Sequence, residues 1–329
     1  MAAPLLEVEH LRVEIPTRRG VLTAIDDVSF AIGEGEVLGV VGESGAGKSL
    51  TGSAIIGLLE PPARIAGGRI RFSGRRIDDL AGEALRRIRG KEIGAIFQDP
   101  LTSLNPLYTV GRQLIETIRV HLGLDRAAAR RRALGLLQEV GIPAPEQRIG
   151  HYPHQFSGGM RQRVDIALAL AANPRLVIAD EPTTALDVSI QAQIIALLKR
   201  LTREHGMAVM LVTHDMGVIA ETADRVAVMY AGRLVEHGPV RAVVQRPQHP
   251  YTVGLMGAIP VLGARRERLR QIDGAMPRLS SIPAGCAFHP RCPEAFARCG
   301  AERPELLPAG PSAAACWLHA GAPREGAHG

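Results

Sequence analysis

The sequence predicts an α/β protein with a mainly parallel central sheet that helices cover on both faces. From residue 162 onward, short apolar runs alternate with segments of helical periodicity. Strands that are apolar throughout are typical of parallel sheets buried on both faces. A glycine-rich loop, Gly42–Ser49, also joins an apolar run to a helical pattern. A chain of 329 residues has room for one large domain and an appendage.

The segment before that loop predicts antiparallel strands. In residues 5–40, apolar and polar side chains alternate, and glycine-containing turns at 17–20 and 33–35 interrupt the pattern. Alternation of this kind is typical of strands with one buried face. Residues 68–80 predict a further short strand pair that turns near Ser73–Gly74.

The loop itself matches the pattern G-x-x-x-x-G-K-S between a predicted strand, Val37–Val41, and a predicted helix, Leu50–Leu58. Glycines allow successive backbone N–H groups to surround an anion, and the N-terminus of the following helix favours the same charge. Lys48 is placed to reach the β- and γ-phosphates, and the Ser49 hydroxyl to bind Mg²⁺. The sequence therefore predicts binding of a nucleoside triphosphate. The predicted phosphate-binding residues are Gly42, Ser44, Gly45, Ala46, Gly47, Lys48 and Ser49.

Residues 99–155 show a different sequence pattern from the segments on either side. Helical periodicity appears in Val110–Val120 and in Arg126–Val140, and Pro- and Gly-rich breaks flank both segments. We predict a helical insert here. Its cluster of basic side chains is interpreted as a solvated face and consists of Arg126, Arg130, Arg131 and Arg132.

After the insert, predicted helices and strands alternate. The predicted helices are Gln162–Ala172 and Ile190–Arg203, and the predicted strands are Leu176–Ala179 and Val209–Val212. In open parallel sheets, ligands bind at the C-terminal ends of the strands. Polar residues that directly follow these strands are therefore candidate catalytic groups.

Four polar residues occupy such positions. Asp180 is expected to hold Mg²⁺, and Glu181 to orient and deprotonate the attacking water. Gln98 is expected to contact the metal or the water, and His214 to bond the γ-phosphate and fix Glu181. Each of these residues alone is commonly structural, but their shared sheet edge and the phosphate loop favour phosphoryl chemistry. The predicted catalytic residues are Glu181, His214 and Gln98, and the predicted Mg²⁺ ligands are Ser49, Gln98 and Asp180.

The overall composition argues against two classes of protein. No apolar run reaches the roughly 18 residues of a membrane-spanning helix, and Glu7 and Glu9 come too early for a signal peptide. The net charge of +6 suits nucleic acid or an anionic membrane surface, but only 3% of residues are aromatic. Few bases could stack on so few rings. We expect a chain that does not itself cross the membrane and has no nucleic-acid partner.

All the cysteines lie in the Pro-, Gly- and Ala-rich segment 245–329. Cys286, Cys292, Cys299 and Cys316 follow the spacing C-x5-C-x6-C-x16-C. Paired disulfides are rare in cytosolic proteins, and four thiolates suit a tetrahedral Zn²⁺ or a [4Fe–4S] cluster. The close C-x2-C pairs of many zinc sites are absent. On this pattern an iron–sulfur cluster, zinc, and unliganded or disulfide-bonded cysteines all remain open.

Together these features resemble an ABC-transporter ATPase subunit over about residues 5–240. Phe156–Arg163 is similar to the family signature, with Phe156 for the usual Leu and Met160 for the usual Gln. Residues 185–187 match the D-loop, whose acidic residue is Asp187. Gln98 and His214 match the Q-loop and the switch histidine. The motifs follow one another in the order that the family has.

The resemblance implies a P-loop NTPase of the ABC-cassette type, with an antiparallel β subdomain, a helical insert and a small cysteine-containing extension. The implied divisions are 1–98 with 156–244 as the ATPase core, 99–155 as the helical signature-side subdomain, and 245–329 as the C-terminal extension. Ile15 occupies the position of the aromatic on which adenine usually stacks, so an apolar contact is expected there instead. The residues implied to serve the ATP of a partner subunit are Ser157, Gly158, Gly159 and Gln162.

Residues 97–106, 151–155, 249–252 and 285–293 further resemble the oligopeptide/dipeptide importer subfamily. That resemblance implies uptake of peptides delivered by an extracytoplasmic binding protein. It also implies two membrane permease subunits, a second and often non-identical ATPase subunit, and a place on the cytoplasmic face of the inner membrane. The helical insert would receive the permeases' coupling helices, and the cysteines would hold a [4Fe–4S] cluster. Nickel, glutathione and other small solutes share the subfamily.

Two other classes use the same cassette. DNA-maintenance ATPases place a long coiled coil between the phosphate loop and the signature, whereas 109 positions separate Lys48 from Ser157 here, counted as 157 − 48. Translation-associated proteins carry two cassettes, and this sequence has one. The transport reading is therefore preferred.

Overall fold

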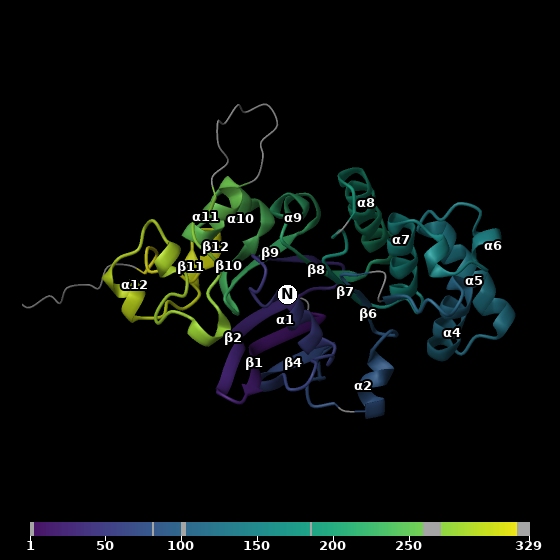
Figure 1. The fold of residues 1–329 in the computed structure, drawn as a ribbon, viewed down its shortest axis with the longest axis horizontal. Coiled ribbons are helices and arrows are strands. Elements are labelled where there is room, and N and C mark those ends of the chain that lie inside the picture. The colour runs from purple at the N-terminus through teal and green to yellow at the C-terminus, as the bar shows by residue number, and fades with distance from the viewer. Residues whose placement is uncertain (1–2, 81, 100–102, 185, 259–270, 321–329) are drawn as a thin grey trace, which may run out of the picture.

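A computed structural model of the protein describes residues 3–80, 82–99, 103–184, 186–258 and 271–320 (Figure 1). Of the positions used for prediction, Ala185 and residues 100–102 lie outside the described residues. The predicted antiparallel region is confirmed. Within the described chain its strands pair in the order β2-β1-β4-β5, and each neighbouring pair is antiparallel. Its strands are β1 (Leu6–Thr17), β2 (Gly20–Ile32), β4 (Arg64–Phe72) and β5 (Arg75–Arg76).

The central sheet has a parallel middle, as predicted. Its strands there run in the order β9-β3-β8-β7-β6, and each neighbouring pair is parallel. They are β3 (Val37–Val41), β6 (Ile93–Ile96), β7 (Leu176–Asp180), β8 (Ala208–Thr213) and β9 (Arg225–Tyr230). An antiparallel edge continues the sheet, which the sequence analysis did not anticipate. It consists of β10 (Arg233–Pro239), β12 (Ser312–Ala314) and β11 (Leu307–Ala309).

Alternate residues of the parallel strands face two different hydrophobic clusters. In β3, Val37 and Val41 belong to one cluster, whereas Leu38 and Val40 belong to the other. The second cluster lies between the two sheets and contains α1 (Lys48–Ile55). On the other face lie α7 (Gly158–Ala169), α8 (Val188–His205) and α9 (Met216–Thr222), and the short α2 (Gly82–Ile88) lies beside the antiparallel sheet. Burial on both faces explains why these strands read as unbroken apolar runs.

The helical insert is present, and side-chain caps set where its helices begin. Thr109 accepts a hydrogen bond from the Arg112 N–H, and Asp125 accepts one from the Ala128 N–H. The insert's elements are α4 (Val110–Leu122), α5 (Arg126–Glu139), α6 (Pro145–Arg148) and the 3₁₀ turn Pro153–Gln155. The solvated-face interpretation was wrong for Arg132, whose Nε donates to the Ala171 carbonyl at 2.8 Å and helps close the end of α7. The other three arginines of that cluster are exposed.

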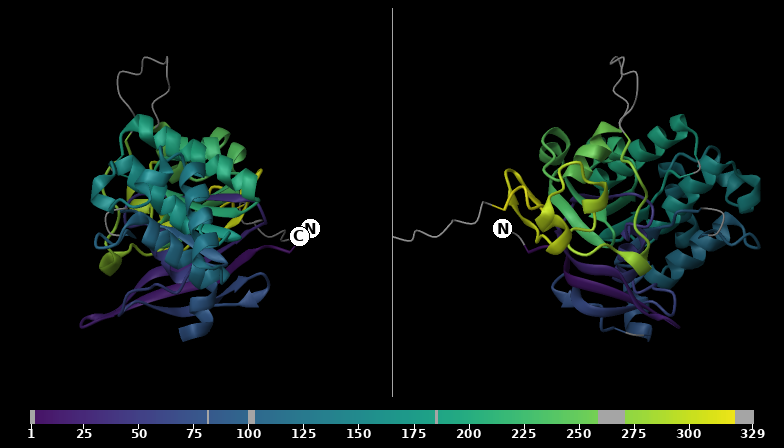
Figure 2. Two further views of the ribbon diagram at one scale, coloured as in Figure 1. Left: turned by 90° about the vertical axis from the view of Figure 1, so that its right-hand side faces the viewer. Right: turned by 60° about the vertical axis from the view of Figure 1, so that its left-hand side comes forward.

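The C-terminal extension folds back onto the core instead of forming a separate body (Figure 2). Within the described residues it adds β11 and β12 to the central sheet and buries Tyr251 and Phe288 in the larger hydrophobic cluster. The buried Glu236 carboxylate accepts backbone hydrogen bonds from Gln248 and His249, both at 2.9 Å, and so fixes the chain reversal. Its remaining elements are α10 (Val240–Gln245), α11 (Pro250–Gly257), α12 (Ala297–Ala301) and the 3₁₀ turns Leu279–Ser281 and His289–Arg291. No helix among the described residues is long and apolar enough to span a bilayer.

Candidate functional site

The phosphate loop connects β3 to α1, and its backbone requires glycine. Gly42 has φ of +155° and Gly47 has φ of +100°. A Cβ atom on Gly42 would lie 2.3 Å from the Met229 carbonyl oxygen, and one on Gly47 would lie 2.6 Å from Ile25 Cδ1. The predicted glycine positions are therefore fixed by both conformation and close packing.

Lys48 lies inside the curl of this loop. Its Nζ donates to the carbonyl oxygens of Gly42 at 2.8 Å and Glu43 at 3.1 Å, and the residue is 5% exposed. Burial lowers the pKa of Lys48, and the nearby Glu181 and Asp180 carboxylates oppose that shift. An ammonium group held in this way has a strong electrostatic preference for an incoming phosphate.

Ser49 and Asp180 form an oxygen pair at the edge of the sheet. The Ser49 Oγ donates to Asp180 Oδ1 at 2.8 Å. Burial raises the pKa of Asp180, and the hydrogen bond from Ser49 opposes that rise. Hydroxyl and carboxylate oxygens are the ligands that Mg²⁺ prefers, so this donor set fits the predicted metal. Mg²⁺ would be held by Ser49 and Asp180 and would neutralise phosphate charge there.

Glu181 is the point on which the predicted catalytic residues converge. Gln98 Nε2 donates to Glu181 Oε2 at 3.0 Å, His214 Nδ1 lies 3.5 Å from Oε1, and Lys48 Nζ lies 4.0 Å from Oε1. Thr184 Oγ1 also donates to Oε2, at 2.8 Å. The backbone of Glu181 adopts φ of +45°, which is uncommon outside glycine and often marks a functional position.

A pocket of about 290 Å³ opens beside the loop. Its lining includes Lys48, Gln98 and Glu181, which places the phosphate-binding and catalytic groups around one space. Ile15 lines the same pocket, as expected for an apolar contact to the base. Leu279 from the extension also lines it, and sequence reasoning missed this residue because nothing in a Pro- and Ser-rich tail indicates a nucleotide contact. Thr184 was missed as well, although it lies three positions after Glu181.

The signature segment lies apart from this pocket. Ser157 precedes the first turn of α7 without a side-chain cap bond, and Ser157 and Gly158 are exposed. Asp187 occupies the same kind of position before α8 and is also exposed. Gln162 differs, because it is 1% exposed and its Nε2 is buried with no hydrogen-bond partner among the described residues. The helix thus presents its start to solvent but turns Gln162 toward the core.

The four cysteines, despite their irregular spacing, line one small cavity together with His249 and Trp317. None of them forms a disulfide. Burial raises the pKa of Cys286 and Cys292, and that of Cys316 to about 11. Among the described residues, no group of three or more His, Cys, Asp or Glu is arranged to hold a metal ion as it stands. Four thiols are soft ligands of the kind that bind zinc or an iron–sulfur cluster, but the predicted [4Fe–4S] cluster stays a prediction.

Two family models match the chain. The ABC transporter family model matches residues 25–184, and the model of the oligopeptide/dipeptide transporter C-terminal region matches residues 235–299. The first match spans the phosphate loop, Gln98 and Glu181. The second spans most of the extension that contacts the loop.

Curated relatives match along nearly the whole chain. The dipeptide transport ATP-binding protein DppD of Escherichia coli (strain K12) is 48% identical over 302 residues, which cover 92% of each chain. A Brucella abortus (strain 2308) protein described as a peptide import ATP-binding protein is 50% identical over 315 residues, covering 92% of this chain and 93% of its own.

Solved structures of ATP-binding cassettes share the fold. A dimeric cassette, MJ0796, in a post-hydrolysis state with ADP and phosphate has a TM-score of 0.65 at 31% identity, covering 72% of this chain and 99% of its own. The cbiO1 subunit from Clostridium perfringens has a TM-score of 0.63 at 30% identity, covering 74% and 92%. With its glycine loop, converging acids and both family matches, the chain belongs to the ABC transporter family, among the ATP-binding proteins that carry the oligopeptide/dipeptide transporter C-terminal region.

Proposed function

We propose that this ABC ATPase energises uptake of dipeptides or oligopeptides across the cytoplasmic membrane, from its cytoplasmic face. The observation that carries the proposal is the relationship to dipeptide and peptide import proteins at 48% and 50% identity, which includes the C-terminal region. ATP hydrolysis supplies the energy. The solute itself is recognised by other subunits, so nickel, glutathione or another small solute is the alternative cargo.

In the proposed reaction, the phosphate loop binds the triphosphate and Glu181 acts as general base toward water. Its contacts support this role, because Gln98, Thr184 and His214 orient both carboxylate oxygens. The Lys48 ammonium stabilises charge on the phosphates. Ser49 and Asp180, with Gln98 as the third predicted ligand, would hold Mg²⁺, which would neutralise phosphate charge.

A second ATPase subunit, identical or paralogous, is proposed to complete the site. The exposed start of α7 at Ser157–Gly159 offers backbone N–H groups and a positive helix end to an anion. Beside Asp187, the side chain of Val188 is 81% exposed, which suits an interface. The similar cassette MJ0796 was solved as a dimer.

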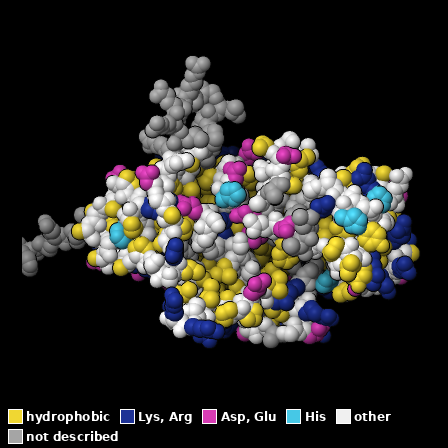
Figure 3. All heavy atoms as spheres, in the orientation of Figure 1, with side chains coloured by type: hydrophobic (Ala, Val, Ile, Leu, Met, Phe, Trp, Pro, Cys, Tyr) yellow, Lys and Arg dark blue, Asp and Glu magenta, His cyan; other side chains and the backbone are white. Residues whose placement is uncertain are grey.

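Two membrane permease subunits are proposed to dock on the helical insert. A hollow of about 920 Å³ there is lined by apolar Ile115 and Val120 and by charged Glu116, Arg112 and Arg119. Val120 is 65% exposed. Figure 3 shows Lys and Arg side chains gathered at the outer margin of this lobe. An extracytoplasmic binding protein would reach the assembly through the permeases.

Reconstitution tests the import function. The chain would be co-purified with its permeases and partner ATPase, placed in lipid nanodiscs, and assayed for ATP hydrolysis with its binding protein. We expect a dipeptide-loaded binding protein to raise the hydrolysis rate several-fold. Stimulation by nickel or glutathione alone would redirect the cargo assignment, and an assembly without permeases would contradict import.

For the cysteines, we propose a structural [4Fe–4S] cluster bound by Cys286, Cys292, Cys299 and Cys316, with zinc as the alternative. Support comes from their shared cavity, which brings four sulfur donors to one place. Because burial raises the pKa of Cys316 to about 11, a bound cluster would have to displace its proton. Anaerobic purification with absorbance near 400 nm and iron analysis tests this. Colourless protein with stoichiometric zinc would overturn the choice of iron.

A further inference from the structure

The extension touches the phosphate loop directly, at Glu43. The Tyr251 hydroxyl oxygen accepts a hydrogen bond from the Glu43 N–H at 2.8 Å. Arg291 Nη1 donates to Glu43 Oε2 at 3.0 Å. These partners are separated from Glu43 by 208 and 248 positions along the chain. One loop residue is thus held through both its backbone and its side chain by the extension.

Tyr251, which contacts the Glu43 backbone, is held in place by packing that does not involve the loop. Tyr251 is fully buried in α11, and its ring packs edge-to-face against Tyr230 with centroids 4.8 Å apart. Phe288, also from the extension, lies against both rings, at 5.4 Å from Tyr251 and 5.2 Å from Tyr230. Packing of this kind leaves the hydroxyl little freedom to move away from Glu43.

Arg291 is constrained by hydrogen bonds instead. Its Nε donates to the Asp273 carbonyl oxygen at 2.8 Å, and its Nη2 donates to those of Ile272 and Gly274, both at 3.3 Å. The side chain is 7% exposed. The guanidinium therefore meets the Glu43 carboxylate as a fixed, largely desolvated charge, and such a pair is lost at greater cost than a surface ion pair.

The position of Glu43 in the phosphate loop makes its charge and its conformation relevant to ATP binding. A carboxylate in a loop that accepts a triphosphate adds repulsion, and the Glu43 charge is close enough to act on the pKa of Lys48. Arg291 neutralises that charge and draws the carboxylate toward the extension. Lys48 also holds the Glu43 carbonyl, but it must turn to the phosphates when ATP binds. The contacts from Tyr251 and Arg291 do not depend on Lys48.

We propose that Tyr251 and Arg291 are positioning residues for ATP. Through Glu43, the extension keeps the phosphate loop in the shape that accepts nucleotide, so that ATP affinity depends on a segment outside the catalytic sheet. Leu279, which lines the nucleotide pocket, places a second part of the extension at the same site.

The test compares single and double variants of the full-length chain in ATP binding and steady-state hydrolysis. We expect Arg291→Ala to raise the KM for ATP about tenfold while kcat changes less than about threefold, which is the signature of lost ground-state binding. Glu43→Gln in the same chain should not multiply that loss, because both changes act on one pair. Tyr251→Phe keeps the ring packing and should raise KM about threefold.

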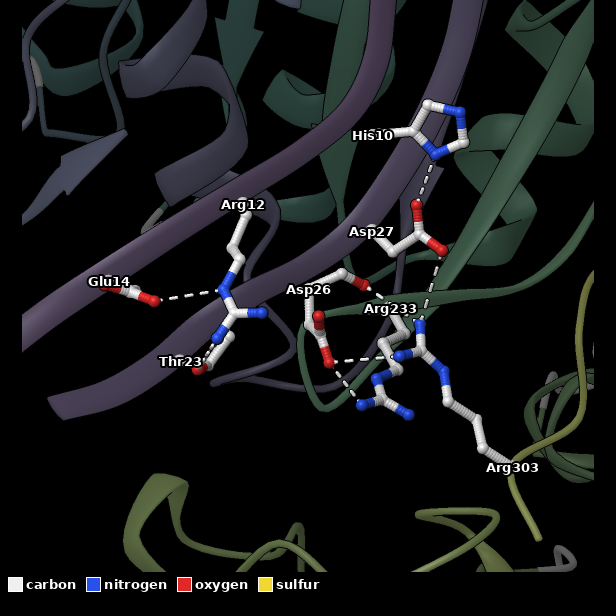
Figure 4. A network of polar contacts seen from close by, with 8 residues as sticks. All are labelled: His10, Arg12, Glu14, Thr23, Asp26, Asp27, Arg233 and Arg303. Carbon is white, nitrogen blue, oxygen red and sulfur yellow. Dashed lines mark hydrogen bonds and ion pairs between the residues drawn. The ribbon is translucent and has the colours of Figure 1, made fainter. Parts of the chain in front are cut away.

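Control substitutions of two other arginines in the extension test whether KM depends on the contact with Glu43 or only on docking of the extension. Arg303 joins the extension to the antiparallel sheet elsewhere, with its Nη1 3.2 Å from Asp26 Oδ2 and its Nη2 3.7 Å from Asp27 Oδ2 (Figure 4). Asp26 also pairs with Arg233, and His10 pairs with Asp27 at 2.7 Å. Arg303→Ala therefore loosens docking without touching Glu43. Arg298→Ala removes an exposed pair with Glu302 and a cation–π contact with Trp317, and it serves as a second reference because neither contact involves Glu43.

The expected pattern is a raised KM in the Arg291 and Tyr251 variants and a KM within about twofold of wild type in the Arg303 and Arg298 variants. A KM unchanged by Arg291→Ala would overturn the proposal. So would effects of Arg291→Ala and Glu43→Gln that multiply, or an Arg303→Ala variant that raises KM as much as Arg291→Ala. If Arg291→Ala does not fold, the single variants Tyr251→Phe and Glu43→Gln are compared with the control Arg303→Ala, and a KM no higher than that of the control would overturn the proposal. None of these measurements depends on the transported solute.

Discussion

The phosphate loop is held differently on its two sides. On the core side, Lys48 and Ser49 contact groups at the end of β7, where Asp180 and Glu181 project. On the other side, Tyr251 and Arg291 of the extension hold Glu43. In the proposed reaction, the core-side groups are the ones that would exchange partners when phosphate and metal bind. The extension-side groups keep their partners because packing and carbonyl oxygens fix them.

This difference separates chemistry from positioning. A change on the core side alters interactions that strengthen in the transition state, so it should lower kcat. A change on the extension side alters the shape of the loop before reaction, so it should raise KM. The following substitutions test that division from the largest expected effect to the smallest.

Glu181→Gln should have the largest effect. Removing a general base typically costs between about a hundredfold and ten-thousandfold in rate. We expect kcat to fall about a thousandfold while ATP still binds, so that an ATP-bound dimer accumulates. Phosphate release and size-exclusion chromatography measure the two outcomes. Glu204→Gln, on the exposed end of α8, is the matched control, and retained turnover in Glu181→Gln would remove this residue from the chemistry.

Lys48→Ala should weaken nucleotide binding about a hundredfold, because a buried charge-assisted contact to phosphate is lost. The division predicts that this variant fails at binding, whereas Glu181→Gln fails at turnover. Titration with a fluorescent ATP analogue measures the affinity. The control is Lys199→Ala, because Lys199 is a half-buried lysine of α8 whose Nζ donates to the Glu221 carbonyl oxygen. Near-normal affinity in Lys48→Ala would contradict the phosphate-loop assignment.

The ATPase core and the extension should also differ in how pH changes their contribution to the free energy of unfolding. Asp165 of α7 is buried, its Oδ2 lacks a hydrogen-bond partner, and burial raises its pKa to about 7. The folded state then binds more protons than the unfolded state between about pH 4 and pH 7, so Asp165 lowers stability as pH rises through that window. In the extension, burial lowers the pKa of His249 to about 3. His249 therefore lowers stability in the opposite direction, as pH falls below about 6.5.

Asp165→Asn isolates the first effect. We expect the variant to gain unfolding free energy relative to wild type at both pH values, about 4 kcal/mol at pH 8 but only about 1.5 kcal/mol at pH 5, because the cost of keeping the buried carboxyl protonated grows with each pH unit up to its folded pKa. Urea denaturation at the two pH values measures the difference. An equal effect at both pH values would show that Asp165 does not titrate in this window.

Leu279→Ala should have the smallest effect. The side chain is one of the apolar groups that line the pocket shared by Lys48 and Glu181. We expect a twofold to fivefold rise in the KM for ATP, on the order of 1 kcal/mol or less of apolar contact. Leu306→Ala, 37% exposed elsewhere in the extension, is the control. An equal KM in the two variants would mean that the extension acts on the loop only through Glu43.

Much of the catalytic side was predictable because its signals are local. The loop Gly42–Ser49 and the pair Asp180–Glu181 each combine a contiguous motif with a flanking strand, so strand and helix order alone brings them to one sheet edge. Their mutual contacts, such as Gln98 to Glu181, follow from that shared edge. Helix ends were less well predicted, since α7 begins four residues before Gln162 and ends at Ala169.

The sequence by itself determined the nucleotide class, the sheet that carries the phosphate loop and the candidate catalytic acids, because short-range patterns encode all three. Only the tertiary structure decided which residues hold the outer side of the loop. Tyr251 and Arg291 reach Glu43 because the extension folds back onto β10, through the bonds of Glu236 to residues 248 and 249 and through the later pairing with β12. No local pattern specifies these contacts. The burial of Gln162 was decided in the same way, since packing against the core selects which face of α7 turns inward.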